Sequence, residues 1–92
     1  MSNSIDAVLA ERGKRYGKFS EHANISQMIK ILMFDSSPDL ELDWDQREAL
    51  EMIAHKIARI VNGDPNYADN WIDIAGYATL VANRLEKEDN AA

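Results

Sequence analysis

The sequence predicts an all-α protein, a four-helix bundle that is completed by oligomerisation. Apolar residues recur at intervals of three and four along most of the chain, which is the spacing of a helix with one apolar face. The two prolines, Pro38 and Pro65, lie in short polar segments that interrupt this pattern. A chain of 92 residues is short enough for one core, so we expect a single helical domain over residues 1–92.

Composition and charge limit the classes of function. The chain is 46% hydrophobic and 28% charged, as globular proteins are, and it has no cysteine for a disulfide or a thiolate metal site. Its formal net charge of −6 disfavours general nucleic-acid binding but allows a metal cation or a basic protein partner. Residues 25–34, the longest apolar stretch, are too few to cross a bilayer, and residues 1–6 do not resemble a signal peptide. We therefore expect no membrane association and a cytoplasmic location.

The first two predicted helices span residues 4–12 and 20–34. Ser4 and Ser20 are suitable N-caps for them. Gly13 and Gly17 predict a turn or an irregular extension between the two helices. The second helix is apolar on more than one side near its end, so we expect it to have more than one neighbour.

The third and fourth predicted helices span residues 44–62 and 68–86, and a flexible polar tail follows over residues 87–92. Asp43 or Asp45 can cap the third helix, and Gly63 suits its end. Gly76 lies within the fourth helix, where glycine costs about 1 kcal/mol relative to alanine, so we expect a close neighbour there. The predicted apolar faces comprise Leu50, Ile53, Ala54, Ile57, Ile60 and Val61 on the third helix, and Trp71, Ile74, Ala75, Ala78, Val81, Ala82 and Leu85 on the fourth.

The small size of the chain predicts self-association. A single core of fewer than about 80 residues is usually marginal in stability. Two of the helices also carry apolar residues outside their main face, such as Ile72 and Leu80 on the fourth. Another copy of the chain would cover them, so we predict a homodimer or a higher homo-oligomer.

Three carboxylates are candidates for a metal site. Glu48 and Glu51 lie one turn apart on the third predicted helix, and Asp73 lies on the fourth, level with Glu51 if these two helices pair antiparallel. Such a site would hold Mg²⁺ or Mn²⁺ with oxygen ligands only. The alternative is a solvated surface for the two glutamates and a buried ion pair for Asp73, with Arg59 or Lys56 as its partner.

Two segments resemble the signature of the MazG-type all-α nucleotide pyrophosphohydrolases, EExxE followed by ExxD on a later helix. They are Arg47-Glu48-Ala49-Leu50-Glu51 and Asn70-Trp71-Ile72-Asp73-Ile74-Ala75-Gly76-Tyr77. The resemblance implies a MazG-like helical dimer or tetramer that uses Mg²⁺ to hydrolyse nucleoside triphosphates to monophosphate and pyrophosphate. It places Glu48, Glu51 and Asp73 at catalytic and metal-binding positions, with Asn70 as a further metal ligand.

Two positions depart from this signature. Arg47 stands where the first Glu of EExxE is expected, and Asn70 stands where the Glu of ExxD is expected. An amide oxygen carries no charge, so these departures predict one of two outcomes. Either the metal is held more weakly, with Asp69 as a substitute ligand, or the protein is a non-catalytic relative that only binds.

A second resemblance covers more of the chain, from about residue 11 to residue 85. The segments that carry it are Glu11-Arg12 to Tyr16-Gly17, Asp45 to Glu51 with Gly63-Asp64-Pro65, and Asp69 to Leu80. They are similar to an uncharacterised group of small phage and prophage proteins. This resemblance implies expression in a bacterial cytoplasm and implies no activity.

A basic, glycine-containing segment is a candidate phosphate site. Residues 12–19 combine four cations, two glycines and two aromatic rings within an acidic chain. Arg and Lys neutralise phosphate, and an aromatic ring can stack on a base, although a solvated turn explains the same residues equally well. The predicted nucleotide- and phosphate-binding residues are Arg12, Lys14, Arg15, Tyr16, Lys56 and Arg59. We expect structural roles for His22 and His55, because neither has a partner histidine at ligand spacing.

Three functions remain open from the sequence. The first is a Mg²⁺-dependent nucleotide pyrophosphohydrolase, and the second is a relative that binds nucleotides without turnover. The third is a small acidic phage protein that binds and inhibits a host enzyme or defence component. A nucleotide panel with Mg²⁺ separates the first two, and capture of a protein from a bacterial lysate tests the third.

Overall fold

The protein is all-helical, as predicted. A computed structural model describes residues 3–91 and contains no strand in that range. Its four helices are α1 (Asn3–Tyr16), α2 (Phe19–Asp35), α3 (Trp44–Asn62) and α4 (Ala68–Ala91). None of these helices is long and apolar enough to cross a membrane.

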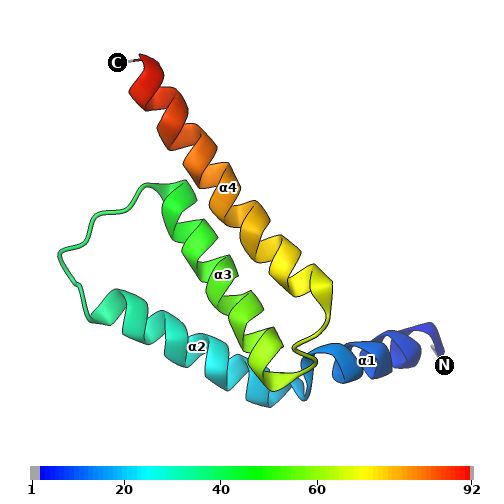
Figure 1. Ribbon diagram of the computed structural model, residues 1–92. Helices are drawn as coiled ribbons and strands as arrows, with labels where there is room; N and C mark the ends of the chain where they lie inside the picture. Colours follow the sequence, from blue (N-terminus) through cyan, green and yellow to red (C-terminus); the bar gives the residue numbers. More distant parts are fainter. Residues whose placement is uncertain (1–2, 92) are drawn as a thin grey trace.

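The helices α2, α3 and α4 form one layer with α3 in the middle (Figure 1). Within this layer α3 runs roughly antiparallel to both α2 and α4, and α4 extends past the start of α3 toward the C-terminus. The helix α1 points away from this layer and meets it only near the end of α3 and the start of α2. The protein is therefore elongated, with extents of 56 × 27 × 27 Å.

The first helix is longer than predicted. We expected it to end at residue 12, but α1 continues through Gly13 to Tyr16. The ion pair between Glu11 Oε1 and Arg15 Nε, 2.9 Å apart, spans the glycine from one turn to the next. Such a pair offsets part of the cost of a helical glycine, so Gly13 does not end the helix.

Two glycines let α1 and α2 meet the end of α3. Gly17 has a φ of 76°, and its N–H donates to the Gly13 carbonyl at 2.9 Å, which ends α1 in a left-handed residue. A Cβ on Gly17 would overlap the Asn62 carbonyl oxygen, and one on Gly63 would overlap the Arg15 carbonyl oxygen. Asn62 Nδ2 donates to the carbonyls of residues 16 and 18 at 3.0 and 3.1 Å, so this joint is held by hydrogen bonds as well as by close contact.

The starts of α2 and α3 differ from each other. The N-cap of α2 is Lys18, so Ser20 is a first-turn residue of the helix and not the predicted cap. The N-cap of α3 is Asp43, one of the two predicted residues. Its N–H donates to Gln46 Oε1 at 2.8 Å, which satisfies a backbone donor at the helix start.

The fourth helix does not end in the polar tail that we predicted. It continues as a helix to Ala91, while residue 92 lies outside the described range. Arg84 pairs with Glu88 one turn later at 2.9 Å, and it also contacts Asp45 and Asp43 at 2.6 and 2.9 Å. These pairs support the helix locally and join it to the start of α3.

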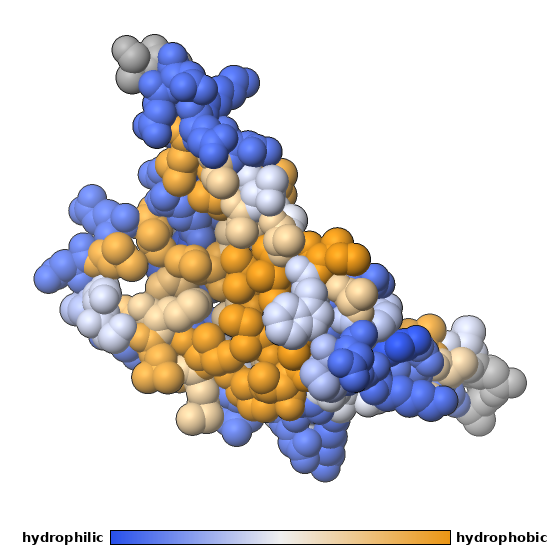
Figure 2. All heavy atoms as spheres, in the orientation of Figure 1, coloured by the Kyte–Doolittle hydropathy of each residue, from blue (hydrophilic) through white to orange (hydrophobic). Residues whose placement is uncertain are grey.

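The core of a single chain is small. Within the described part of the chain, the buried apolar residues are Ala49, Ala54, Ala58 and Ile60. Leu50, Ile57 and Val61, which we expected to be inside, are 36%, 38% and 65% exposed. Figure 2 shows hydrophobic side chains spread widely over one face of the molecule. Among the described residues of one chain, the expected close neighbour of Gly76 is not found, because a Cβ there would meet nothing within 4 Å.

Candidate functional site

One pocket lies where the end of α1, the start of α2 and the middle of α3 meet. It encloses about 330 Å³, and we call it the basic pocket. Arginine, lysine, histidine and aromatic side chains line it together with two glycines, and no carboxylate does. Its lining residues are Leu9, Arg12, Gly13, Tyr16, Gly17, Lys18, Phe19, His22, His55 and Arg59.

Helical spacing brings these side chains to the pocket in pairs. Arg12 and Tyr16 are four residues apart on α1, and His55 and Arg59 are four apart on α3. Residues at this spacing share one face of a helix. The joint at Gly17 then turns the chain so that the face of α1 meets the face of α3.

The cations of the basic pocket are held differently. The Arg59 guanidinium lies 4.0 Å above the centre of the Tyr16 ring, so it is fixed by a cation–π contact. Arg12 and Lys18 are exposed, and neither belongs to any ion pair found between residues that the structure describes. Two of the three cations are therefore available to an anion.

Two histidines meet at the pocket. His22 Nε2 lies 3.3 Å from His55 Nδ1, and the two rings meet edge to face with their centres 4.5 Å apart. His22 is only 4% exposed, and its Nδ1 is buried without a hydrogen-bond partner in the described part of the chain. A buried, unpaired nitrogen is costly, so a ligand that bonds to it would gain affinity.

The environment keeps both imidazoles neutral near pH 7. Burial lowers the pKa of His22, and the charges of Arg59 and Lys30 lower it further. For His55, burial is again the largest cause, followed by the Arg59 charge, and its pKa falls from 6.5 to about 4. The pair is therefore a hydrogen-bonding group at neutral pH, and it becomes a cation only in acid.

The predicted metal-binding carboxylates lie elsewhere. Asp73 pairs with Lys56 Nζ at 2.9 Å, one of the two partners considered from the sequence, but its side chain is 44% exposed and not buried as that alternative had it. Glu51 lies 4.0 Å from Arg47 Nε. Glu48 is exposed. Across residues 3–91, no three His, Asp or Glu side chains are grouped so that they could hold a metal ion. The magnesium site that the MazG resemblance implies stays a prediction.

The two residues that depart from the MazG signature have structural positions. The Arg47 guanidinium lies 4.1 Å above the Phe34 ring, so it packs α3 against α2. Asn70 is 1% exposed, and its Nδ2 has no hydrogen-bond partner among the described residues. Asn70, predicted as a metal ligand, is therefore buried within the protein.

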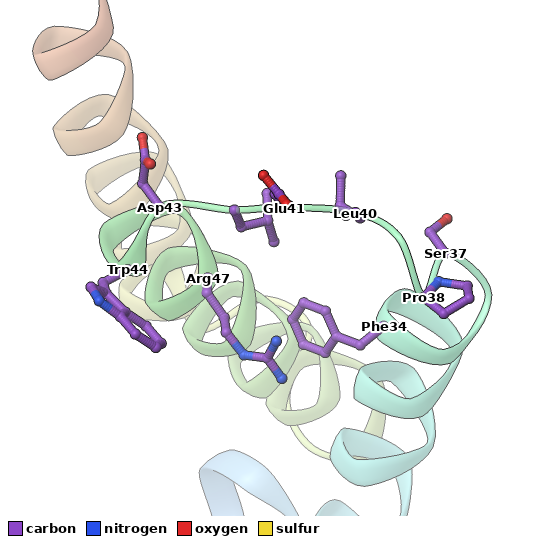
Figure 3. Close-up of a pocket in the computed structure, with 9 residues that line it drawn as sticks. Phe34, Ser37, Pro38, Leu40, Glu41, Asp43, Trp44 and Arg47 are labelled. Carbon is purple, nitrogen blue, oxygen red and sulfur yellow. The ribbon is translucent and has the colours of Figure 1, made fainter.

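A larger and more open pocket lies under the loop between α2 and α3. It encloses about 740 Å³, and Figure 3 shows Phe34 and Arg47 facing each other beneath this loop. Two carboxylates, Glu41 and Asp43, line it, while its one cation already packs on an aromatic ring. This pocket is therefore less suited to an anion than the basic pocket is.

Half of the predicted phosphate-binding residues come together. Arg12, Tyr16 and Arg59 line the basic pocket. Arg15 instead pairs with an α1 carboxylate and lies 4.3 Å above the Tyr67 ring. Lys56 is occupied by Asp73, and Lys14 is exposed outside the pocket lining.

Lys18 and Phe19 belong to the basic segment of residues 12–19 that the sequence marked as a candidate phosphate site, whereas we expected structural roles for His22 and His55. A signal was present, because Phe19 and His22 lie one turn apart, and His55 lies one turn before Arg59. Spacing alone could not show that the two helix faces meet, since the residues are more than 30 positions apart along the chain.

The fold and the pocket define a small all-helical protein with a basic site at the junction of three helices. The chain belongs to the family described as Domain of unknown function (DUF6378), whose model matches residues 1–85. No curated protein and no solved structure gave a match. The matched residues include the whole basic pocket. The resemblances to MazG-type enzymes and to phage proteins stay predictions.

Proposed function

We propose that this protein binds a nucleotide, that the basic pocket holds the phosphates, and that binding needs no metal ion. The charge of the pocket carries the proposal. Arg12, Lys18 and Arg59 line the pocket without a carboxylate, in a chain whose net charge is −6. Cations gathered in a concave site against the overall charge of a protein favour an anionic ligand.

Phosphate is the anion that suits this lining best. A guanidinium presents a planar set of donors that matches two phosphate oxygens at once. Gly13 has nothing within 4 Å of the position of a Cβ, so the backbone of α1 is open to a ligand there.

An aromatic ring and the pocket volume support a nucleotide over free phosphate. Phe19 is 77% exposed at the pocket edge, so its ring is available to stack on a base. Ligand pockets enclose about 300–1,000 Å³, and the 330 Å³ of the basic pocket lies at the small end of this range. A mononucleotide is therefore the expected size of ligand.

The magnesium-dependent pyrophosphohydrolase is a narrower version of this proposal. It requires Asp73 and Glu51 to bind a cation, and both carboxylates already have cationic partners in Lys56 and Arg47. A metal would have to displace both ion pairs. For this reason we propose binding and leave turnover to the experiment.

We further propose that the protein acts as a homo-oligomer. A compact domain of 92 residues has a radius of gyration of about 12 Å, whereas this chain has 16.2 Å. Its few buried apolar residues are mostly alanines. Association with further copies would supply the core that the single chain lacks.

Binding is tested by thermal shift and calorimetry with nucleoside mono-, di- and triphosphates, each with EDTA and with Mg²⁺. We expect stabilisation in EDTA by the nucleotides and none by the bare nucleoside. Arg12→Gln should weaken nucleotide binding about tenfold, because it removes one charge-assisted contact. Lys87→Gln removes the same charge from an exposed position of α4, far from the pocket, and should leave binding unchanged.

The results separate the alternatives. An absence of stabilisation by every nucleotide at millimolar concentration would rule out the proposed function. Pyrophosphate release with Mg²⁺, abolished by Asp73→Ala, would instead support the hydrolase. Equal weakening by Arg12→Gln and Lys87→Gln would indicate an effect of net charge and not a site.

A further inference from the structure

The layer formed by α2, α3 and α4 has one apolar face that nothing in the described chain covers. In Figure 2, hydrophobic side chains gather over all three helices and form a continuous area in the middle of this face. The hydrophilic side chains in this view lie mainly around its edge. The face therefore resembles the interior of a helical protein exposed to solvent.

The middle helix contributes one stripe to this face. Leu50, Ile57 and Val61 follow one another at intervals of seven and four residues, so they lie along one side of α3. A groove with Leu50 on its α3 side and Ala78 on its α4 side shows that both helices share this side.

The second helix extends the same face. Met28 and Leu32 lie one turn apart on α2 and are 57% and 71% exposed. The buried side of α2, which faces α3, carries His22 and Ser26. Met28 and Leu32 lie next to this side in one direction around the helix, and Lys30 lies next to it in the other direction. The apolar area seen over α2 is thus the flank with Met28 and Leu32.

We infer that a second copy of this chain packs on this face and that the homodimer is built across it. The inference rests on the proposed homo-oligomer and adds which surface forms it. Two helical layers with their apolar faces together make a standard two-layer core. If the partner supplies half of the hydrophobic core, the chain needs that partner whenever it folds. A second copy of the chain is always available at that moment, whereas another protein is not.

The exposed area agrees with this size of interface. A compact protein of 10.4 kDa exposes about 5,400 Å², whereas this chain exposes 6809 Å². The excess, about 1,400 Å², lies within the roughly 1,000–2,500 Å² that each partner buries in obligate homodimers. Because the centre of the face is uncharged, two acidic copies can meet there without bringing like charges together.

The dimer leaves the basic pocket open. Successive residues of a helix are rotated by about 100°, so Ile57 points nearly opposite to His55 and Arg59, which lie two positions away on either side. Ile57 belongs to the dimer face, and the other two residues line the pocket. Assembly and ligand binding therefore use opposite sides of α3.

The test uses glutamate substitutions at equally exposed apolar positions. Leu32→Glu and Val61→Glu place a carboxylate on the proposed face. Leu80→Glu is the matched control, because Leu80 is 68% exposed and lies two residues from Ala78, on the other side of α4. Light scattering after size exclusion and sedimentation equilibrium measure the mass and the dissociation constant. We expect a wild-type dimer, an increase of the dissociation constant of about 100-fold or more for the two face variants, and no change for Leu80→Glu.

Each result supports or overturns the inference. If the wild type is a dimer but only Leu80→Glu dissociates it, the oligomer stands and the proposed face is wrong. If the wild type is a monomer at every concentration, both the oligomer and the face are wrong, while nucleotide binding is judged by its own experiment. Circular dichroism checks that the variants fold. If a face variant does not fold, hydrogen exchange of the wild-type protein at several concentrations takes its place. If the protection of α2 and α3 does not rise with protein concentration, the proposed dimer face is wrong.

Discussion

The close packing of Gly17 against Asn62, where α1, α2 and α3 meet, predicts a large effect of substitution at Gly17. This residue has a φ of 76°, and a Cβ on it would overlap the carbonyl oxygen of Asn62. Gly17→Ala should therefore destabilise the protein. Gly13→Ala, the same change four residues earlier, should do the opposite, because Gly13 is helical and has open space around it.

The size of the effect follows from the contacts. A left-handed backbone costs a residue with a side chain about 1–2 kcal/mol. Moving Asn62 away from the new Cβ also breaks its bonds to the carbonyls of residues 16 and 18, each of which contributes about 1 kcal/mol. The lower entropy of unfolded alanine offsets about 0.4–1 kcal/mol. We expect Gly17→Ala to lower the free energy of unfolding by about 2–3.5 kcal/mol, and Gly13→Ala to raise it by about 0.5–1 kcal/mol.

Urea unfolding followed by circular dichroism measures both changes. The variants must be compared at one chain concentration, because the stability of an oligomer depends on concentration. Gly17→Ala should also weaken nucleotide binding, since the joint positions α1 over the basic pocket. A Gly17→Ala protein as stable as the wild type would show that the close contact with α3 is wrong.

Three further predictions concern charged groups. Asp73→Ala should destabilise the fold by about 1–2 kcal/mol in urea unfolding, because it leaves the nearly buried Lys56 unpaired; an unchanged midpoint would refute the pair. As the pH falls from 6.5 toward 4, His55 takes up a proton in the unfolded chain but not in the folded chain. The free energy of unfolding should therefore fall by at most about 1.4 kcal/mol per pH unit in this range. His55→Gln should make the free energy of unfolding less dependent on pH there. The hydrogen bond from Arg84 lowers the pKa of Asp45 below its ordinary value of 3.8. The stabilisation of the fold by this pair is therefore present above pH 3.8 and is lost as the pH falls through the lower pKa of the folded protein. In Arg84→Gln, NMR titration should show a higher pKa for Asp45.

The sequence could predict the helices because their signals are local. Apolar spacing marked all four, and Asp43 and Gly63 marked the ends of α3. The predicted ends of α1 and α4 were too early, and the causes are also local. Ion pairs one turn apart stabilise α1 on both sides of Gly13 and α4 as far as Glu88. Each pair offsets part of the cost of a glycine or of a polar composition, and apolar spacing does not show which pairs form.

The site could be predicted only in part, because it depends on how the helices pack. The cations of residues 12–19 were visible in the sequence, and so was helical spacing on α3. That Asp73 would face Lys56, and that His22 would meet His55 across two helices, depends on the rotation of each helix about its axis. Composition and spacing do not fix that rotation.

The contact between the two histidines constrains their tautomers. Two neutral rings that share one hydrogen bond must be a matched pair. If His22 Nε2 is the donor, His22 Nδ1 is an acceptor and His55 Nε2 carries a proton; if His55 Nδ1 is the donor, both outer atoms exchange these roles. The pair can therefore present either hydrogen-bonding pattern to the groups around it by moving protons and no heavy atom. After protonation both outer nitrogens become donors, so acid turns this adaptable group into one that only donates.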